Sequence, residues 1–364
     1  MSNKKIKVGI THGDMNGIGY EVILKTLEDN RMLELCTPIV YGQLALAEKY
    51  CKMCDIPPVP FNVIDKPSDA REDANNMINV VPADVPLNPG ESSSVAGEAA
   101  FASLEHAVTD LKKGEIDVLV TAPINKKNIQ GPHFDFPGHT EYLQHCSDDP
   151  DADALMILFN DRLRIALVTT HLPIAEIAQA ITVDSVSSKL KKFYQSLEKD
   201  FGLTHPRIAV LALNPHAGDG GIIGKEEEEV IIPAIEKARK EGVNCFGPYA
   251  ADGFFGAEQY RSFDGVLAMY HDQGLAPFKT LAMDNGVNFT AGLPFVRTSP
   301  DHGTGYDIAG KGTASEVSMR EAIYAAIDIF RNRQRYMRSH RNPLRRQYFD
   351  KSKDNVVLDL TKDS

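Results

Sequence analysis

The sequence predicts an α/β protein with a largely parallel sheet that helices cover on both faces. Short apolar runs typical of buried strands alternate with longer segments that have helical periodicity. Helices of this length suit the crossover connections between parallel strands. Three of the apolar runs also end at a histidine: RIALVTTH at His171, RIAVLALNPH at His216 and GVLAMYH at His271. Because ligands of such folds collect at the carboxyl ends of strands, these histidines indicate a functional site.

The first third of the chain is predicted to begin with a strand at 6–10, the turn GDMNG and a helix over 18–29. Ile18, Val22 and Leu27 recur at helical spacing in that segment. Ser92, Ser93 and Ser94 precede a longer helix as capping residues would. The elements expected after the first helix are strand TPIVYG, a helix over 44–53, brief strands near Phe61 and Ile78, a helix over 94–113 and strand DVLVTAP.

The middle of the chain repeats this alternation. The runs LMILF and RIALVTT are separated by the turn-forming Asn160 and Asp161, which predicts a hairpin. The elements expected next are helices over 174–181 and 183–201, strand RIAVLALN, a helix over 226–240, strands CFGPYA and GVLAMYH, and a last helix over 315–333. A charged tail follows from about residue 342. No linker marks a domain boundary, and the sheet could continue across both halves.

Composition limits the class of protein. The chain has 364 residues, 43% of them hydrophobic, which is enough for a packed core. The apolar stretch near the N-terminus is too short for a signal peptide, and no run approaches the roughly 20 apolar residues of a membrane span. We therefore expect a cytoplasmic protein with no membrane partner. The formal net charge of −11 argues against nucleic-acid binding, and the basic stretch at 331–346 is interpreted as a solvated helix end.

The five cysteines do not form a disulfide scaffold in a chain of this length. Cys51 and Cys54 form a CxxC motif, but no second pair follows at zinc-ribbon spacing. We interpret them as two ordinary thiols at a helix end.

Three histidines at strand ends predict a metal site. A single histidine in such a position is as often structural, with its ring satisfied by a backbone carbonyl. Three together favour a metal, because neutral imidazoles with open coordination positions suit zinc or another late first-row divalent ion. Spacing alone does not prove that they converge in space. The glycines of NPHAGDGGIIG are interpreted as backbone accommodation around His216, and the glutamates at 226–229 as first-turn helix residues on a solvated face.

Other motifs point to an anionic ligand. In PGHTEYL, His139 and Thr140 stand at a helix start and suit a donor pair, and Lys279, Asn288 and Arg297 could supply positive charge and polar contacts. The turn GDMNGIG lacks both the lysine of a P-loop and the third glycine of GxGxxG, so we interpret it as a tight turn at a helix N-terminus. No GxSxG motif occurs, which argues against a serine hydrolase.

These strings together resemble the 4-hydroxythreonine-4-phosphate dehydrogenase (PdxA) family of pyridoxal phosphate synthesis. The resemblance covers most of the chain in the right order: GDMNGIGYE, TAPINK, PGHTEYL, THLP, NPHAGDGG, YHDQGLAPFK and FVRTSPDHGTGYDIAGKG. It implies metal-dependent, NAD-linked oxidative decarboxylation of 4-phosphohydroxy-L-threonine to 3-amino-2-oxopropyl phosphate and CO2. It implies NAD or NADP as cofactor, together with a divalent metal for which zinc is the first choice and cobalt and magnesium are alternatives.

The resemblance also assigns roles to positions of this chain. It implies metal ligation by His171, His216 and His271. Substrate is expected at His139, Thr140, Lys279, Asn288 and Arg297, and the catalytic candidates are Asp252, Asp272 and Lys279. The segment 302–312 is similar to the adenosine-binding loop of isocitrate and isopropylmalate dehydrogenases, which assigns dinucleotide binding to His302, Gly303, Asp307 and Gly310.

The same resemblance implies a two-domain α/β/α fold of the isocitrate/isopropylmalate dehydrogenase type with its active site in the interdomain cleft. We expect a first domain from 1–137 plus 298–345 that carries the dinucleotide loop. A second domain at 138–297 would carry the metal ligands and the dimer interface, and 346–364 would be a charged tail. The family is homodimeric with one metal ligand from the partner chain, so an isolated chain should lack a complete metal site.

The chain departs from the usual GDPAGIGPE motif at Met15, Asn16 and Tyr20, and Gly253 follows Asp252 where threonine is common. These changes could reshape the pocket, and relatives act on other phosphorylated acids such as 4-phosphothreonates. Two alternatives from other classes remain at this stage. A metal-dependent hydrolase would act without NAD and would leave the 302–312 loop unexplained, and a non-catalytic phosphate-ligand or metal-sensing protein would bind ligand without forming NADH.

Overall fold

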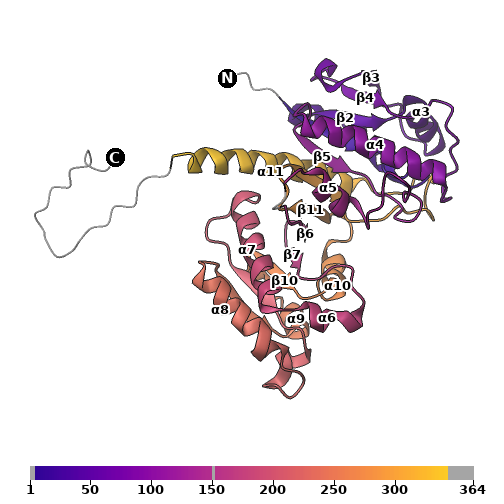
Figure 1. The fold of residues 1–364 in the computed structure, drawn as a ribbon. Coiled ribbons are helices and arrows are strands. Elements are labelled where there is room, and N and C mark those ends of the chain that lie inside the picture. Colours follow the sequence, from indigo (N-terminus) through magenta and orange to yellow (C-terminus); the bar gives the residue numbers. More distant parts are fainter. Residues whose placement is uncertain (1–4, 150–151, 343–364) are drawn as a thin grey trace, which may run out of the picture.

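A computed structural model describes residues 5–149 and 152–342. Its strands form one sheet in the order β3-β4-β2-β1-β5-β12-β11-β6-β7-β10-β8-β9 (Figure 1). The first six strands in this order are β3 (Phe61–Val63), β4 (Asn75–Asn79), β2 (Cys36–Gly42), β1 (Ile6–Thr11), β5 (Val118–Thr121) and β12 (Val296–Pro300). The other six are β11 (Val287–Ala291), β6 (Leu155–Phe159), β7 (Arg164–Leu167), β10 (Gly265–Ala268), β8 (Ile208–Leu211) and β9 (Cys245–Tyr249). The predicted α/β class with a mostly parallel sheet is confirmed.

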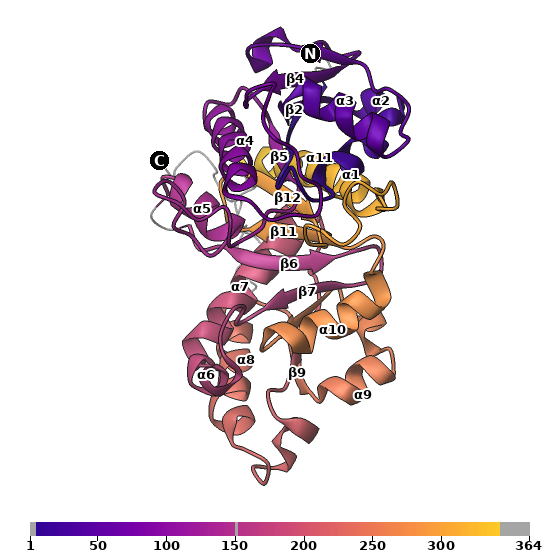
Figure 2. The ribbon, with the colours of Figure 1, turned by 90° about the vertical axis from the view of Figure 1, so that its right-hand side faces the viewer.

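The centre of the sheet is antiparallel. β11 runs antiparallel to both β12 and β6, and β6 pairs antiparallel with β7 as the predicted hairpin. On either side of this centre the strand pairs are parallel, for example β1 with β5 and β10 with β7. Figure 2 shows the sheet running without a break from β4 at one end to β9 at the other.

Helices cover both faces. One face carries α1 (Gly19–Glu28), α3 (Leu44–Met53), α7 (Val183–Lys199), α8 (Ile232–Lys240) and α11 (Val317–His340). The other carries α4 (Ser94–Lys112), α5 (His139–Cys146), α9 (Ala251–Gly256) and α10 (His271–Ala282). In the lower part of Figure 1, α7 and α8 lie on one side of the strands and α10 lies on the other. The remaining α-helices are α2 (Met32–Leu35) and α6 (Ile174–Ala180).

Strand residues alternate between these two layers. Val8 and Ile10 of β1 belong to the core with α1 and α11, whereas Ile39 and Tyr41 of β2 belong to the core with α4. Every residue of β2 is buried, on both faces of the strand. Burial on both faces is the signature of a covered, largely parallel sheet. The apolar runs of the sequence therefore became central strands.

Several elements differ from their predicted bounds. Strand GVLAMYH ends at Ala268, so His271 opens α10 instead of closing the strand. The last helix runs from Val317 to His340, beyond the predicted end at 333, and the predicted helix over 226–240 begins with a π-helical turn at Glu227–Ile231. Short 3-10 turns stand at Pro67–Asp69, Pro215–Asp219 and Gln259–Ser262.

The sheet continues across the predicted domain boundary, which at residues 297 and 298 falls within β12. Helix α5 follows the predicted boundary at residue 137 in sequence, yet its buried Tyr142 and Leu143 join the core that α4 forms with β2. The division into two domains stays a prediction, and the expected tail at 346–364 lies outside the described residues. No helix in the described part of the chain combines the length and the apolar character needed to cross a membrane.

Candidate active site

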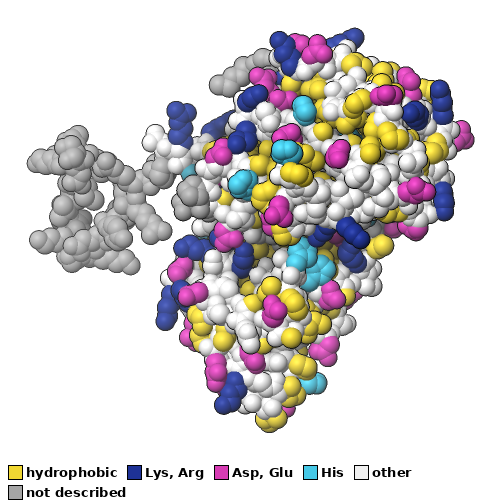
Figure 3. All heavy atoms as spheres, turned by 45° about the vertical axis from the view of Figure 1, so that its right-hand side comes forward, with side chains coloured by type: hydrophobic (Ala, Val, Ile, Leu, Met, Phe, Trp, Pro, Cys, Tyr) yellow, Lys and Arg dark blue, Asp and Glu magenta, His cyan; other side chains and the backbone are white. Residues whose placement is uncertain are grey.

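A cavity of about 320 Å³ opens on the face of β6, β11 and β12, between the first turn of α5 and helix α10. Its floor is made by alternate residues of these strands, including Leu158, Asn288 and Arg297. Predicted site residues from separate parts of the chain line it: His139, Thr140, His171, His271, Lys279, Asn288, Arg297, His302 and Gly303. Figure 3 shows histidine side chains gathered in the hollow where the upper and lower parts of the molecule meet.

His171 and His271 lie close together. β7 and β10 are parallel neighbours, so the segments that follow them reach the same edge of the sheet. The two imidazole rings are 6.0 Å apart between centroids. Nδ1 of His271 lies 2.7 Å from Oδ1 of Asp272, and this contact leaves Nε2 available for a metal. A carboxylate behind a histidine is the usual way to orient a metal-binding imidazole.

His216 is not among the residues that line the cavity. It follows β8 on an exposed 3-10 turn and has a φ of 54°, in the left-handed region. Within residues 5–149 and 152–342 no group of three or more histidine, cysteine or carboxylate side chains is placed to hold a metal. One chain therefore brings two of the three predicted metal ligands together and leaves the third apart.

The loop of His216 is held by Glu227. The prediction that all glutamates at 226–229 lie on a solvated face is wrong for Glu227, which is 2% exposed. Its Oε1 accepts hydrogen bonds from the backbone N–H groups of Leu213 and Asn214, both at 2.8 Å. A buried carboxylate satisfied by backbone donors can stabilise the left-handed turn that follows. The glycines also fit their predicted role, since Gly218 has a φ of +78° and a Cβ there would lie 2.7 Å from Glu227 Oε2.

The cavity is cationic at its floor. Arg297 is 3% exposed and donates to the hydroxyls of Thr121 and Thr290. Burial lowers the pKa of Arg297 to about 10, so the side chain stays charged at neutral pH. Lys126 and Lys279 add two ammonium groups to the lining. Such a cluster suits an anionic ligand, in a protein whose net charge would otherwise repel one.

Some polar atoms in the cavity have no hydrogen-bond partner among the described residues: His139 Nε2, His302 Nε2 and Asn288 Oδ1. Burial, reinforced by Arg297 and Lys126, holds the pKa of His139 well below its usual value, so its ring is neutral. Burial likewise lowers the pKa of His302. Buried polar atoms without a protein partner are expected where a ligand completes the hydrogen bonding.

Other predicted residues lie outside the lining. Asp252 is exposed in the first turn of α9, and the side chain of Asp272 is 83% exposed behind His271. Asp307 and Gly310 belong to the continuation of the 302–312 loop, where Gly310 packs against Met53. Sequence reasoning did not single out three lining residues, Lys126, Glu141 and Asp301. Lys126 and Glu141 stand inside the quoted strings TAPINK and PGHTEYL, which was the available signal.

The three departures from the family motif are buried and do not line the cavity. Met15, Asn16 and Tyr20 are at most 1% exposed. Asn16 Nδ2 donates to the carbonyl of Glu91 at 2.8 Å, and Tyr20 stacks between His12 and Tyr50. These substitutions therefore contribute to the packing of the GDMNG turn against neighbouring elements and do not contact the cavity.

Fold and cavity together define the class: an α/β protein that presents imidazoles and cations at the carboxyl ends of its strands, where such folds bind small ligands. Residues 34–326 match the family described as pyridoxal phosphate biosynthetic protein PdxA, and the chain belongs to this family. The resemblance read from the sequence is thereby confirmed.

The relatives extend over nearly the whole chain. A 4-hydroxythreonine-4-phosphate dehydrogenase from Bacteroides thetaiotaomicron is 54% identical over 99% of this chain and 98% of the relative. A D-threonate 4-phosphate dehydrogenase from Cupriavidus necator is 39% identical over 90% of this chain and 98% of the relative. Among solved structures, the 4-hydroxythreonine-4-phosphate dehydrogenase from Klebsiella pneumoniae has 34% identity and a TM-score of 0.76, covering 90% of this chain and 100% of that chain.

Proposed function

We propose that this protein is a 4-hydroxythreonine-4-phosphate dehydrogenase, which oxidatively decarboxylates 4-phosphohydroxy-L-threonine to 3-amino-2-oxopropyl phosphate and CO2. The observation that carries the proposal is the cavity, in which His139, Thr140, Lys279, Asn288 and Arg297 face the same space as His171 and His271. The full-length similarity to a relative of that name supports the same substrate and reaction.

The substrate has a phosphate at one end and a hydroxyl beside an amino acid group at the other. We assign the phosphate to the cationic part of the cavity, with Arg297 and Lys279 as charged donors and the His139–Thr140 pair at the start of α5. Binding energy from this remote group orients the reacting carbon, so a dephosphorylated substrate should lose rate as well as affinity. The side-chain amide of Asn288, which also lines the cavity, can donate or accept a hydrogen bond with the substrate.

His171 and His271 fit two coordination positions of a divalent metal. Burial lowers the pKa of His171, which favours the neutral imidazole that a metal requires. Within the loop, His302 and Gly303 reach the cavity and are placed to hold the dinucleotide near the substrate. When bound, the metal polarises the hydroxyl that is oxidised and NAD or NADP accepts the hydride. The donor set suits zinc, with cobalt or magnesium as alternatives.

The chain's own residues bind, orient and move protons. Among the three catalytic candidates Lys279 lines the cavity, with Nζ 3.0 Å from the carbonyl of Asp301, and it is placed to contact the substrate. Asp272 is placed to orient His271 through its 2.7 Å contact with Nδ1. Oxidation of the hydroxyl leaves a ketone β to the carboxylate, and an acid of this type loses carbon dioxide readily.

We further propose that the working form is a homodimer and that His216 of one chain completes the metal site of the other. The separation of His216 from the cavity of its own chain supports this arrangement. In a two-fold dimer each subunit would give and receive the same ligand, so two equivalent sites would form.

The test follows NADH absorbance in the presence of 4-phosphohydroxy-L-threonine, NAD and a divalent metal, and then again with a chelator. We expect NADH and CO2 to form together, and chelation to abolish both. His271→Ala should abolish turnover while leaving the circular dichroism spectrum unchanged. Absence of NADH with zinc, cobalt and magnesium would reject the dehydrogenase assignment for this substrate.

D-threonate 4-phosphate should be tested as a second substrate in the same assay, because a relative of 39% identity is named a D-threonate 4-phosphate dehydrogenase. The two substrates differ in the group next to the oxidised carbon, and kcat/KM for each decides between them. The hydrolase and the non-catalytic binding protein gain no support from the relatives reported above, which are named dehydrogenases. A hydrolase would turn over substrate without NAD.

A further inference from the structure

The 302–312 loop needs external support, because it carries several glycines. Gly305, Gly310 and Gly312 all have positive φ values, of 54°, 74° and 68°. A segment of this kind has much conformational freedom unless neighbouring elements restrain it. A loop that binds a dinucleotide with useful affinity should be ordered before the ligand arrives, since ordering it on binding costs affinity.

The beginning of the loop is attached to the start of α1. The backbone N–H of Ile18 donates to the carbonyl of Thr304 at 2.9 Å. A Cβ on Gly17 would lie 2.6 Å from that carbonyl oxygen, so the close approach requires glycine there. The middle of the loop is attached to the GDMNG turn that precedes α1, because the hydroxyl of Tyr306 donates to Oδ2 of Asp14 at 2.7 Å.

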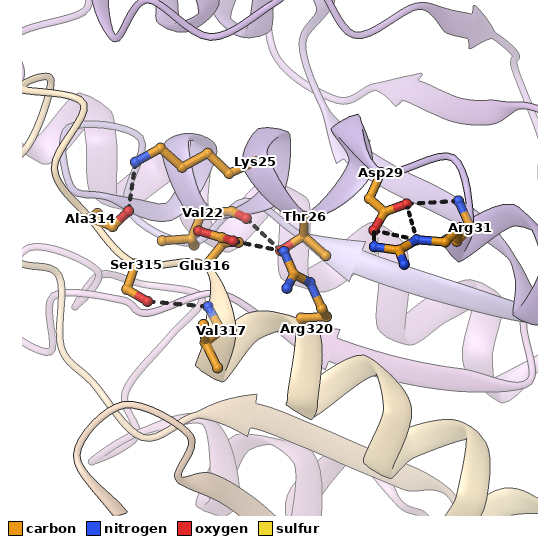
Figure 4. A network of polar contacts seen from close by, with 10 residues as sticks. All are labelled: Val22, Lys25, Thr26, Asp29, Arg31, Ala314, Ser315, Glu316, Val317 and Arg320. Atoms are coloured by element: carbon orange, nitrogen blue, oxygen red, sulfur yellow. Dashed lines mark hydrogen bonds and ion pairs between the residues drawn. The ribbon is translucent and has the colours of Figure 1, made fainter.

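The end of the loop is attached to one buried ion pair on α1. Lys25 Nζ lies 2.8 Å from Glu21 Oε1 and donates to the carbonyls of Gly312 at 2.9 Å and Ala314 at 2.6 Å. The same Oε1 accepts the backbone N–H of Ala314 at 2.8 Å. Figure 4 shows Lys25 reaching from α1 to the carbonyl of Ala314. The three N–H donors of the lysine are thus directed at the glutamate and at the loop end.

Burial distinguishes this pair from an ordinary helical i,i+4 pair. The side chain of Glu21 is 0% exposed and that of Lys25 is 20% exposed. On the same helix end, the Arg31–Asp29 pair has side chains that are 84% and 29% exposed. A buried ion pair loses hydration, and apolar residues of similar size often stabilise a fold equally well. Its hydrogen bonds to residues 312 and 314 therefore indicate that it fixes a particular backbone position.

A second contact presses the loop end onto this pair from α3. Gly312 lies so close to the carbonyl of Cys54 that a Cβ would be 2.7 Å from it. Cys54 Sγ in turn donates to Glu21 Oε2 at 3.6 Å. The end of the loop is thereby fixed between the ion pair of α1 and the C-terminus of α3.

We propose that Glu21 and Lys25 are positioning residues for dinucleotide binding: they hold the end of the 302–312 loop in the conformation that receives the cofactor, without touching the reacting atoms. This inference rests on the proposed function, which gives the loop its ligand. Loss of either charge should release residues 312–314, weaken dinucleotide binding, and leave the substrate and metal parts of the cavity intact.

The test compares Lys25→Met with Lys25→Arg and with the control Arg31→Gln, which removes an exposed ion pair from the same helix end. Steady-state kinetics should show KM for NAD raised roughly tenfold in Lys25→Met, with kcat and KM for the phosphorylated substrate within about twofold of wild type. Lys25→Arg should recover most of the loss because it keeps the charge, and Arg31→Gln should behave as wild type. Equal losses in both KM values, or an unchanged KM for NAD, would overturn the proposal.

Hydrogen exchange provides a readout that needs no ligand or turnover. Peptides that span 303–314 should exchange roughly tenfold faster in Lys25→Met than in wild type, whereas peptides from β6 and β7 should be unaffected. Glu21→Gln keeps the side-chain shape and should give the same pattern should Lys25→Met fold poorly. Uniformly faster exchange throughout the protein would overturn the positioning role. A wild type that binds no dinucleotide would refute the proposed function, and the exchange result would still decide whether the pair anchors the loop.

Discussion

Arg297 donates from Nε and Nη2 to the hydroxyl of Thr121, at 3.0 and 2.6 Å, on the floor of the cavity. In the described part of the chain no carboxylate forms an ion pair with it. Arg333 is buried to a similar degree, yet its Nε contacts Asp200 Oδ1 at 2.6 Å. A buried guanidinium without a carboxylate in direct contact is costly, even with Glu141 acting on it from elsewhere in the cavity lining. The difference between these two arginines indicates that an anionic ligand completes the site of Arg297.

Arg297→Met should therefore abolish stabilisation by phosphate without destabilising the protein. Inorganic phosphate is expected to raise the melting temperature of the wild type, because a ligand stabilises the state that binds it. In Arg297→Met that increase should vanish, while the melting temperature without phosphate stays equal or rises. The control Arg333→Met should keep the phosphate response but lose about 3–5 kcal/mol of stability, since it leaves Asp200 unpaired. Differential scanning calorimetry of the three proteins with and without phosphate measures these changes. An undiminished phosphate response in Arg297→Met would exclude Arg297 as the anion anchor.

The sequence was most informative where apolar residues form continuous runs. Strands such as TPIVYG and LMILF are buried on both faces, and their composition alone marks them. β11 (VNFTA) and β12 (VRTSP) were missed because polar residues interrupt them. Three of those polar residues, Asn288, Arg297 and Ser299, line the cavity. The polar residues that made these strands hard to predict thus include residues that form the site.

Local patterns could not place residues that act through distant contacts. The run of glutamates that contains Glu227 has the composition of a solvated first turn, and only the fold shows that one carboxylate turns inward to the backbone of Leu213 and Asn214. Likewise, Glu21 and Lys25 look like an ordinary i,i+4 pair in the sequence. Their partners lie almost 300 residues further along the chain, at Gly312 and Ala314.

Glu227→Leu is expected to weaken metal binding through the loop of His216. The substitution leaves the N–H groups of Leu213 and Asn214 without their acceptor, which costs about 1–3 kcal/mol each when buried. The left-handed turn at His216 should then lose order, and affinity for zinc should fall roughly 10–100-fold, as for supporting contacts in other metal sites. Competition with a chelating dye measures the affinity. Glu228→Leu, at an exposed neighbouring position, is the matched control, and equal zinc affinities in the two variants would contradict this role of Glu227.

His12 should make the protein less stable in acid. Its ring is fully buried and stacks on Tyr20 at 5.2 Å between centroids, and burial lowers its pKa to about 4. Because this value is below the unfolded value near 6.5, the unfolded chain takes up the proton first as the pH falls. The contribution of the neutral ring is fully present above about pH 6.5 and is lost as the pH falls toward 4. The folding stability lost in this way over the whole pH range is on the order of 3 kcal/mol.

Urea unfolding at pH 7 and pH 4.5 measures this loss. The decrease in stability between the two values should be smaller in His12→Gln than in wild type, whatever the variant's stability at pH 7. His106→Gln, on the exposed face of α4, should keep the wild-type decrease. Identical decreases in all three proteins would show that His12 does not control the acid response.

Mixing two inactive variants tests the shared metal site. If His216 of each chain completes the site that contains His171 and His271 of the other, then His216→Ala and His271→Ala are each inactive as homodimers. A mixed dimer contains one site with both defects and one with none, by the two-fold symmetry of the exchange. Random reassortment of equal amounts makes half of the dimers mixed, so activity should recover to about a quarter of the wild type.

The two variants are combined after mild dissociation and reassociation, and NADH formation is compared with that of each variant treated alone. A mixture of His171→Ala with His271→Ala is the control. It should stay inactive because His171 and His271, whose rings lie 6.0 Å apart, serve the same site, so every site in the mixture lacks one of them. If all three ligands came from one chain, the first mixture would stay as inactive as the control. Recovery in the first mixture alone therefore requires that the exposed turn of His216 serves the cavity of a second subunit.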